Sequence, residues 1–107
     1  MTQFVHPGKE DITLAGVLGA LGDPVRLEIL RKLLDERRGG LSCSAAAPCA
    51  EMAKSTLSHH FRVLRDAGLI RTTKQGVENM NSVRSEDLNE RFPGLLATIM
   101  KLHRATG

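Results

Sequence analysis

The clearest helical pattern of the chain lies in the segment 54–69. Leu57, Phe61 and Leu64 follow one another at i, i+4 and i+7, which predicts an amphipathic helix with these residues against a core. The other face carries small polar and basic side chains, namely Ser55, Ser58, His59 and Arg62. Short hydrogen-bonding groups read base edges, and cations hold phosphates. The segment therefore predicts the recognition helix of a helix-turn-helix.

Residues near the ends and the margin of this helix add detail. Ser55 is predicted to be the N-cap and Gly68 to end the helix. His59 should point outward. His60 falls beside Phe61 at the margin of the core, so we expect a packed histidine hydrogen-bonded to backbone rather than a ligand.

Two helices are expected before this segment. Asp11 is predicted to cap a first helix that runs to about Leu21. Asp23 followed by Pro24 is a strong start signal for a second, which is apolar on more than half of its circumference and should be buried. Gly39–Gly40 should stop it, with Arg37 and Arg38 near its negative end.

The stretch between residues 41 and 53 is irregular. A helix-turn-helix needs its supporting helix here, but Pro48 is tolerated only in a first turn or at a kink. We expect a loop through Cys43 and Ser44, then a short helix that begins near Pro48 and ends before Lys54.

The segments after Gly68 alternate between polar and apolar residues. Leu69–Thr73 and Glu78–Val83, joined by a turn at Lys74–Val77, predict a β-hairpin. Ser85 is expected to cap a turn at Glu86–Arg91. Pro93 should open a last helix with apolar positions at Leu95, Leu96, Ile99, Met100 and Leu102.

Positive charge gathers on the predicted reading segment. The chain of 107 residues has a net charge of +3. Six cations against two acids between residues 54 and 84 give that segment +4, so it holds all of the excess. A solvated basic face would explain the charge but not the helix pattern beside it. This distribution favours a polyanionic partner.

Several segments in order resemble the ArsR/SmtB family. They are ALGDPVRLEIL at Ala20–Leu30, STLSHHFRVLRDAGLI at Ser55–Ile70, and the Lys74-Gln75-Gly76 turn between extended segments. The resemblance covers about residues 12–102. It implies a small winged-helix repressor that binds DNA as a homodimer and releases it when a metal, metalloid, thiol oxidant or other signal arrives.

The predicted fold is mainly α with a small β-hairpin wing: a winged helix-turn-helix over residues 11–107, after an N-terminal arm or frayed end at residues 1–10. Two such subunits should read a pseudo-palindromic operator in double-stranded DNA, with half-sites about one turn apart. The wing should reach phosphate or the minor groove. The candidate DNA-binding residues are Lys54, Ser55, Thr56, Ser58, His59, Arg62, Arg65, Arg71, Lys74 and Gln75.

The first and last helices are expected to form a homodimer interface. The family pairs these two helices, and neither is expected to bury its apolar stripe within so small a chain. The candidate dimerisation residues are Ile12, Val17, Leu18, Leu95, Leu96, Ile99 and Met100.

The two cysteines, Cys43 and Cys49, are candidate sensing residues. Three interpretations stay open: thiols without a role, a redox or persulfide switch that links them, and a soft metal or metalloid held by both. The family's Cys-x-Cys pair and its Asp and His ligands on the last helix are absent. His103 alone offers too few ligands for a closed site. No cofactor is required and no metal site is assigned.

Other function classes fit less well. Ser58 and its neighbouring histidines lack an orienting acid, and the chain has no Gly-rich phosphate loop or zinc-spaced cluster, so we expect no enzyme. No apolar run has the length of a membrane span and no signal peptide opens the chain, which predicts a cytoplasmic protein without a membrane partner. The alternatives to a regulator are a DNA-associated structural protein without sequence preference and a small thiol module for metal trafficking.

Overall fold

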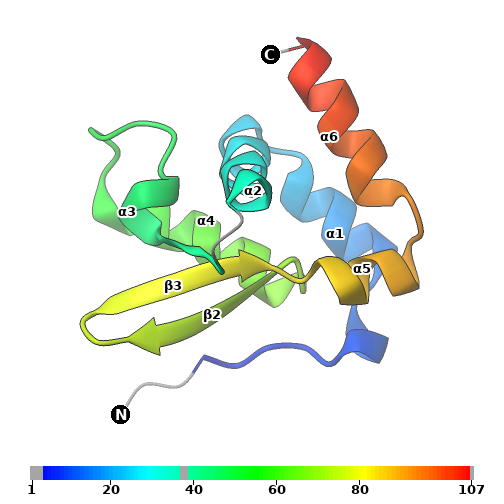
Figure 1. Ribbon diagram of the computed structural model, residues 1–107, viewed down its shortest axis with the longest axis horizontal. Helices are drawn as coiled ribbons and strands as arrows, with labels where there is room; N and C mark the ends of the chain where they lie inside the picture. The colour runs from blue at the N-terminus through cyan, green and yellow to red at the C-terminus, as the bar shows by residue number, and fades with distance from the viewer. Residues whose placement is uncertain (1–3, 37–38, 107) are drawn as a thin grey trace.

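The computed structural model describes residues 4–36 and 39–106. A central helix, α2 (Pro24–Asp35), lies over a three-stranded antiparallel sheet (Figure 1). The helices α1 (Leu14–Leu21) and α6 (Leu95–Thr106) lie towards one end of the molecule, and α3 (Cys43–Ala46) lies towards the other (Figure 1). The predicted class, mainly α with a small hairpin wing, is confirmed. No helix among the described residues has the length and apolar character needed to cross a bilayer.

The central helix α2 (Pro24–Asp35) begins as predicted. Asp23 is the N-cap, and its Oδ1 accepts the backbone N–H groups of Val25 at 2.8 Å and Arg26 at 3.2 Å. The helix ends at Asp35, ahead of the glycines at 39 and 40 that were expected to stop it. Arg37 and Arg38, placed by the sequence at its negative end, lie outside the described residues.

The first helix, α1 (Leu14–Leu21), starts later than expected. Thr13 caps it, since its Oγ1 accepts the N–H of Gly16 at 3.0 Å. The prediction that Asp11 is the cap was wrong because Asp11 belongs to a separate 3₁₀ turn, η1 (Lys9–Asp11). The turn η1 crosses the predicted boundary between an arm at residues 1–10 and a domain at residues 11–107. That division stays a prediction.

The supporting helix, α3 (Cys43–Ala46), lies earlier than predicted. Ser42 caps it by accepting the N–H of Ala45 at 3.2 Å. Ala47 is extended, as a residue before proline prefers, so Pro48 follows the helix rather than opening one. The expected loop through Cys43 and Ser44, and a helix starting near Pro48, are therefore both wrong.

The recognition helix, α4 (Lys54–Asp66), ends as predicted and begins earlier. Ala53 occupies the N-cap position without a side-chain hydrogen bond, so Ser55 as N-cap was wrong. Gly68 has a φ of +84°, and the N–H of Leu69 reaches the carbonyl of Leu64 at 3.0 Å, which is a Schellman ending. A Cβ at Gly68 would come within 2.5 Å of Ile12, so glycine is also needed for close packing.

The wing is the hairpin of β2 (Ile70–Gln75) and β3 (Glu78–Val83). Its turn is shorter than predicted, with Gly76 at a φ of +64°. A third strand, β1 (Leu41–Ser42), pairs with the other side of β3 and was not predicted, because two residues carry no readable alternation. The order β1-β3-β2 leaves β2 at the edge of the sheet.

The chain continues through α5 (Ser85–Arg91) to α6 (Leu95–Thr106). Ser85 was expected to cap α5 but is its first residue. Arg84 occupies the N-cap position and makes no side-chain capping hydrogen bond. The last helix begins two residues after Pro93 rather than at it.

Packing divides the predicted dimerisation residues into two groups. Ile12, Val17, Leu96 and Met100 are buried in the core of the single chain. The expectation that the first and last helices cannot bury their apolar side chains within one chain was wrong for these four, which leaves them no surface for a partner. Leu18 is 48% exposed, and Leu95 and Ile99 are half-buried. Leu14 and Leu102, which were not on the candidate list, are also exposed.

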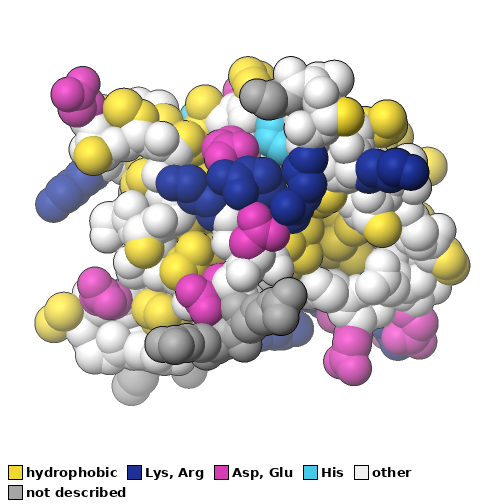
Figure 2. Space-filling model, turned by 45° about the horizontal axis from the view of Figure 1, so that its top comes forward, with side chains coloured by type: hydrophobic (Ala, Val, Ile, Leu, Met, Phe, Trp, Pro, Cys, Tyr) yellow, Lys and Arg dark blue, Asp and Glu magenta, His cyan; other side chains and the backbone are white. Residues whose placement is uncertain are grey.

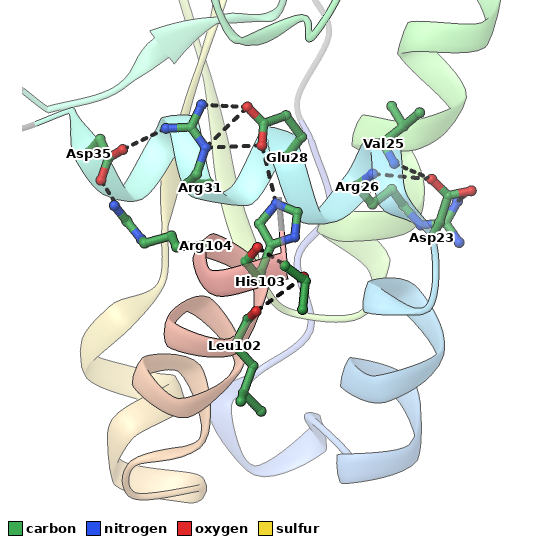
Figure 3. Close-up of polar contacts among 10 residues, drawn as sticks. Asp23, Val25, Arg26, Glu28, Arg31, Asp35, Leu102, His103 and Arg104 are labelled. Atoms are coloured by element: carbon green, nitrogen blue, oxygen red, sulfur yellow. Dashed lines mark hydrogen bonds and ion pairs between the residues drawn. The ribbon is translucent and has the colours of Figure 1, made fainter.

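Polar contacts fasten the end of α6 to the outer face of α2 (Figure 3). Arg31 donates to both carboxylate oxygens of Glu28, and Nε2 of His103 lies 3.2 Å from Oε1 of Glu28. Arg104 donates to Asp35 at 2.7 Å. Hydrogen bonding from Arg31, and to a smaller extent from His103, lowers the pKa of Glu28 from its ordinary 4.5 to about 2.

Removing the charge of Glu28 should weaken the fold in a pH-dependent way. Because the folded-state pKa is depressed, the stabilisation is full above about pH 4.5 and is lost as the pH falls towards 2. Glu28→Gln should lower the free energy of unfolding by about 1–2 kcal/mol at pH 7. Its unfolding should also be less acid-sensitive than that of wild type, as measured by circular dichroism melts. Glu51→Gln, on an exposed turn, is the matched control, and equal losses for both variants would contradict the assignment.

Candidate nucleic-acid interface

The face of α4 that the sequence predicted to read DNA is exposed. Its side chains project from one helix that Leu57, Phe61 and Leu64 anchor in the core. The exposed residues are Lys54, Ser55, Thr56, Ser58, His59 and Arg62. Hydrogen-bonding groups near the helix start and a cation one turn later thus lie on one accessible surface.

His60 is buried, with 8% of its surface exposed, as the helical wheel indicated. Its partner differs from the prediction: Nδ1 lies 3.2 Å from a guanidinium nitrogen of Arg26, whereas a backbone group was expected. The Nε atom of Arg26 in turn donates to the carbonyl of Ala20. The pair therefore joins α4 to α2 and to the end of α1, and it fixes the recognition helix on its support.

The uncapped start of α4 is a second feature of this face. Backbone N–H groups in the first turn of a helix have no intrahelical partner, and Ala53 supplies no side-chain acceptor. Such groups, together with the positive end of the helix dipole, attract phosphate oxygens. Lys54 and Ser55 are exposed at the same end.

The wing presents three of the candidate residues to solvent. Arg71, Lys74 and Gln75 are exposed on β2, while Thr72 between them is buried. Val77, in the hairpin turn, is 96% exposed. The edge strand thus keeps two cations exposed.

The cations of this surface differ from several of those around α2 and α6. Within residues 4–36 and 39–106, Lys54, Arg62, Arg71 and Lys74 take part in no ion pair. A row of Lys and Arg side chains also crosses the face around α2 and α6, with acidic side chains beside it (Figure 2). In that region Arg31 pairs with Glu28 and Asp35, and Arg104 of α6 pairs with Asp35. The α4 and wing cations thus keep their charge available for a polyanion.

Arg65 differs from the other candidate residues because it is engaged within the protein. Its Nε donates to Oγ1 of Thr72 at 3.1 Å, and its guanidinium lies 4.4 Å from the ring centroid of Phe4. Burial lowers the pKa of Arg65. This residue therefore joins α4 to the wing and to the N-terminal segment.

The N-terminal segment is the part of this region that the sequence did not indicate. Nε2 of His6 accepts the N–H of Thr72 at 2.9 Å, and the carbonyl of Pro7 accepts a hydrogen bond from Arg84 at 2.8 Å. Lys9 pairs with Glu90 at 3.0 Å. Residues 4–9 are thus a docked arm along the wing, and no local sequence pattern signals contacts over such separations.

The two cysteines are free and differ in their surroundings. Cys43, the first residue of α3, is half-buried. Nδ2 of Asn81 donates a hydrogen bond to its Sγ at 3.4 Å. Cys49 is exposed in the loop after that helix. A cavity of about 260 Å³ adjoins the first of them, lined by Ser42, Cys43, Ser44, Lys54, Leu57, Ser58, Glu78 and Asn79. Among the described residues, no group of three or more His, Cys, Asp and Glu side chains is placed to hold a metal ion.

A short helix, a second helix with an exposed polar face and an adjacent hairpin define a winged helix-turn-helix, a class of DNA-binding domain. A family model described as a helix-turn-helix domain matches residues 21–73. A helix-turn-helix-type transcriptional regulator of Bacillus subtilis is 34% identical over 90 residues, which cover 84% of this chain and 89% of the relative. An arsenical resistance operon repressor of Staphylococcus xylosus is 35% identical over 81 residues, with 71% of this chain and 70% of the relative covered.

Solved structures agree with these relatives. An ArsR family transcriptional regulator, RHA00566, is 32% identical with a TM-score of 0.63, over 83% of this chain and 93% of that one. A homodimeric winged helix-turn-helix domain from Mycobacterium bovis, described as a possible ArsR-family regulator, is 26% identical with a TM-score of 0.64, over 88% of this chain and 83% of that one. The chain belongs to the ArsR family of helix-turn-helix transcriptional regulators. The resemblance found in its sequence is confirmed.

Proposed function

We propose that this protein is a homodimeric, sequence-specific repressor that binds a pseudo-palindromic operator and leaves it in response to a chemical signal. The observation that carries the proposal is the exposed polar face of α4 with unpaired cations beside it. His59 and Arg62 read base edges or adjacent phosphates, and Arg71 and Lys74 hold the backbone from the wing. No catalytic step is part of this function.

Phosphate contacts set the position of the recognition helix in this proposal. The free N–H groups at the start of α4 hold one phosphate, and the Lys54 ammonium adds charge there. Ser55, Thr56 and Ser58 add short hydrogen-bonding groups on the same face, and Gln75 adds an amide on the wing. Arg65 supports this surface from behind rather than extending from it.

Two copies bind together in this proposal, through the exposed parts of α1 and α6. Leu14 and Leu18 of α1 and Leu95, Ile99 and Leu102 of α6 supply apolar surface that one chain leaves uncovered. The homodimer described for the Mycobacterium bovis relative supports this assembly. A two-fold dimer presents two recognition helices to half-sites about 10 base pairs apart.

Repression is supported by the relation to an arsenical resistance operon repressor. Release through the cysteines is supported by a chain of contacts: Cys43 touches Asn81, whose Oδ1 accepts the Thr72 hydroxyl at 2.8 Å, and that hydroxyl oxygen accepts from Arg65 of α4. Hydrogen peroxide would oxidise the Cys43 and Cys49 thiols to a disulfide and be reduced to two molecules of water. A trivalent metalloid hydroxide would instead bind both sulfurs and release two molecules of water. Either change at Cys43 would disturb the support of the recognition helix.

A titration of the protein against the DNA upstream of its own gene tests the proposal. Reduced protein should bind, and hydrogen peroxide or arsenite should weaken binding by about tenfold or more. The Cys43→Ser, Cys49→Ser double variant should bind as reduced wild type does and ignore both reagents. Mass spectrometry should find the two cysteines linked in the peroxide-released form.

Each other result has a defined meaning. A double variant that still responds would show that the cysteines are bystanders and that the signal acts elsewhere. Equal binding to unrelated DNA would favour a structural DNA-associated protein. Arsenite binding without any DNA binding would favour a metal-trafficking module.

A further inference from the structure

The N-terminal arm covers the outer edge of the wing. In Figure 1 it runs beside β2, the strand that has no strand partner on its outer side. Its attachment consists of the Phe4 ring on Arg65, the His6 ring on Thr72 and the Pro7 carbonyl on Arg84. Each of these three partners is charged or is a backbone group that would otherwise be exposed on the sheet edge.

Thr72 is the point where three parts of the molecule meet. It stands opposite Asn81 in the antiparallel ladder, and its N–H points away from β3 towards His6. Side chains of such a pair approach closely, and here the Thr72 hydroxyl donates to Asn81 at 2.8 Å. The same oxygen accepts from Arg65 of α4. Arm, wing and recognition helix are therefore connected through one buried residue.

The contact of His6 requires a neutral ring. Nε2 accepts the Thr72 N–H, so this nitrogen must carry a lone pair, and a protonated ring has none to offer. The charged groups facing the ring are Arg71 from β2, Arg65 from α4 and Arg84 between β3 and α5. Burial, followed by these three cations, lowers the pKa of His6 below its ordinary 6.5, while a hydrogen bond with the Phe4 backbone opposes the change.

We propose that His6 is a positioning residue for DNA binding: its neutral ring docks the arm on Thr72 and holds the wing against the recognition helix, and protonation of the ring releases the arm. The proposal rests on the proposed DNA-binding function. With the arm released, Thr72 loses its outer hydrogen bond and Arg65 loses the Phe4 ring. The wing cations are then held less firmly relative to α4.

The pH dependence follows from the state of the ring. The lowered pKa keeps His6 neutral and the arm docked at pH 7–8, and docking is lost as the pH falls through the folded-state value below 6.5. Two variants separate docking from titration. In His6→Gln the side-chain oxygen accepts the Thr72 N–H at every pH, and in His6→Ala nothing does.

The experiment measures operator affinity and the hydrogen exchange of the Thr72 amide for wild type and both variants between pH 8 and pH 5. At pH 8 His6→Ala should bind about fivefold more weakly than wild type, and His6→Gln as wild type does. As the pH falls below 6.5, the affinity of wild type relative to His6→Gln should fall towards that of His6→Ala. His59 is exposed and unchanged in all three proteins, so its contribution to binding cancels in these ratios.

Hydrogen exchange separates the ways in which the proposal can fail. The Thr72 amide should be protected in wild type and His6→Gln at pH 8 and unprotected in His6→Ala. Unchanged protection in His6→Ala would overturn the docking contact, and lost protection with unchanged affinity would overturn the positioning role. A constant ratio of wild type to His6→Gln across the pH range would overturn the protonation step. Failure of wild type to bind any operator at pH 8 would instead be a failure of the proposed function.

Discussion

Glutamate in place of Leu18 should separate the two subunits and lower operator affinity by about 100-fold or more. Leu18 is 48% exposed on α1 and lies on the apolar surface assigned to the partner copy. In a two-fold interface each substitution occurs once in each subunit. Two glutamate carboxylates without ionic partners would therefore be desolvated when the dimer forms. A monomer also loses the second half-site, whose contribution comes from high effective concentration rather than from new contacts.

Sedimentation and operator binding measure this effect. Leu102→Glu, at a position 61% exposed on α6, should act in the same direction. Val77→Glu puts the same charge on an exposed apolar side chain in the wing turn and should remain dimeric. All three proteins should keep their helical circular dichroism, because none of these side chains belongs to the core. Wild type that sediments as a monomer at micromolar concentration would refute the assembly.

His59→Ala and Arg62→Ala should each weaken operator binding by about 1–3 kcal/mol with the fold intact. Both side chains are exposed on α4, whereas the anchoring residues of that helix are buried. The loss should be greater for the operator than for unrelated DNA, because base contacts specify while phosphate contacts only position. Fluorescence anisotropy at fixed salt would measure it.

Lys101→Ala is the matched control for these two variants. It removes an exposed cation from α6, away from the recognition helix and wing. Its affinity should stay close to that of wild type. A loss as large as that of Arg62→Ala would mean that general charge, rather than the α4 face, governs binding.

The recognition helix could be predicted because its signals are local and agree with one another. The apolar spacing around Phe61 indicated both the buried and the exposed face, and Gly68 marked its end. The start of α2 was equally clear, since Asp23 and Pro24 each favour the same boundary. Where the apolar period coincides with a correct cap or a correct breaker, the sequence determines that boundary of the element.

The supporting helix could not be placed because its four residues are too few to show a period. A proline in the segment drew the prediction towards a later start, although Ser42 already provided a cap. The prediction of which apolar residues face a partner subunit was partly wrong for a different reason. Ile12 is buried because Gly68 lets it approach closely, and such a contact is visible only once the chain is folded.

The docking of the N-terminal arm could not be predicted from local sequence patterns either. His6 and Thr72 are 66 positions apart, and nothing near His6 indicates a partner. The role of Arg65 depended on the same contact: its place on the helical wheel suggested a DNA contact, while the structure engages it with Phe4 and Thr72. Hydrogen bonds between an edge strand and residues distant in the sequence therefore could not be predicted from the sequence.

A footprint of the reduced protein on the DNA upstream of its own gene tests the central claim most directly. Two protected half-sites about 10 base pairs apart centre to centre, related by two-fold symmetry, are expected from a dimer that presents two copies of α4. His59→Ala should remain folded and give the same protection only at a higher protein concentration, in line with its expected loss of about 1–3 kcal/mol. Protection that spreads evenly along the DNA without a preferred site would contradict the account.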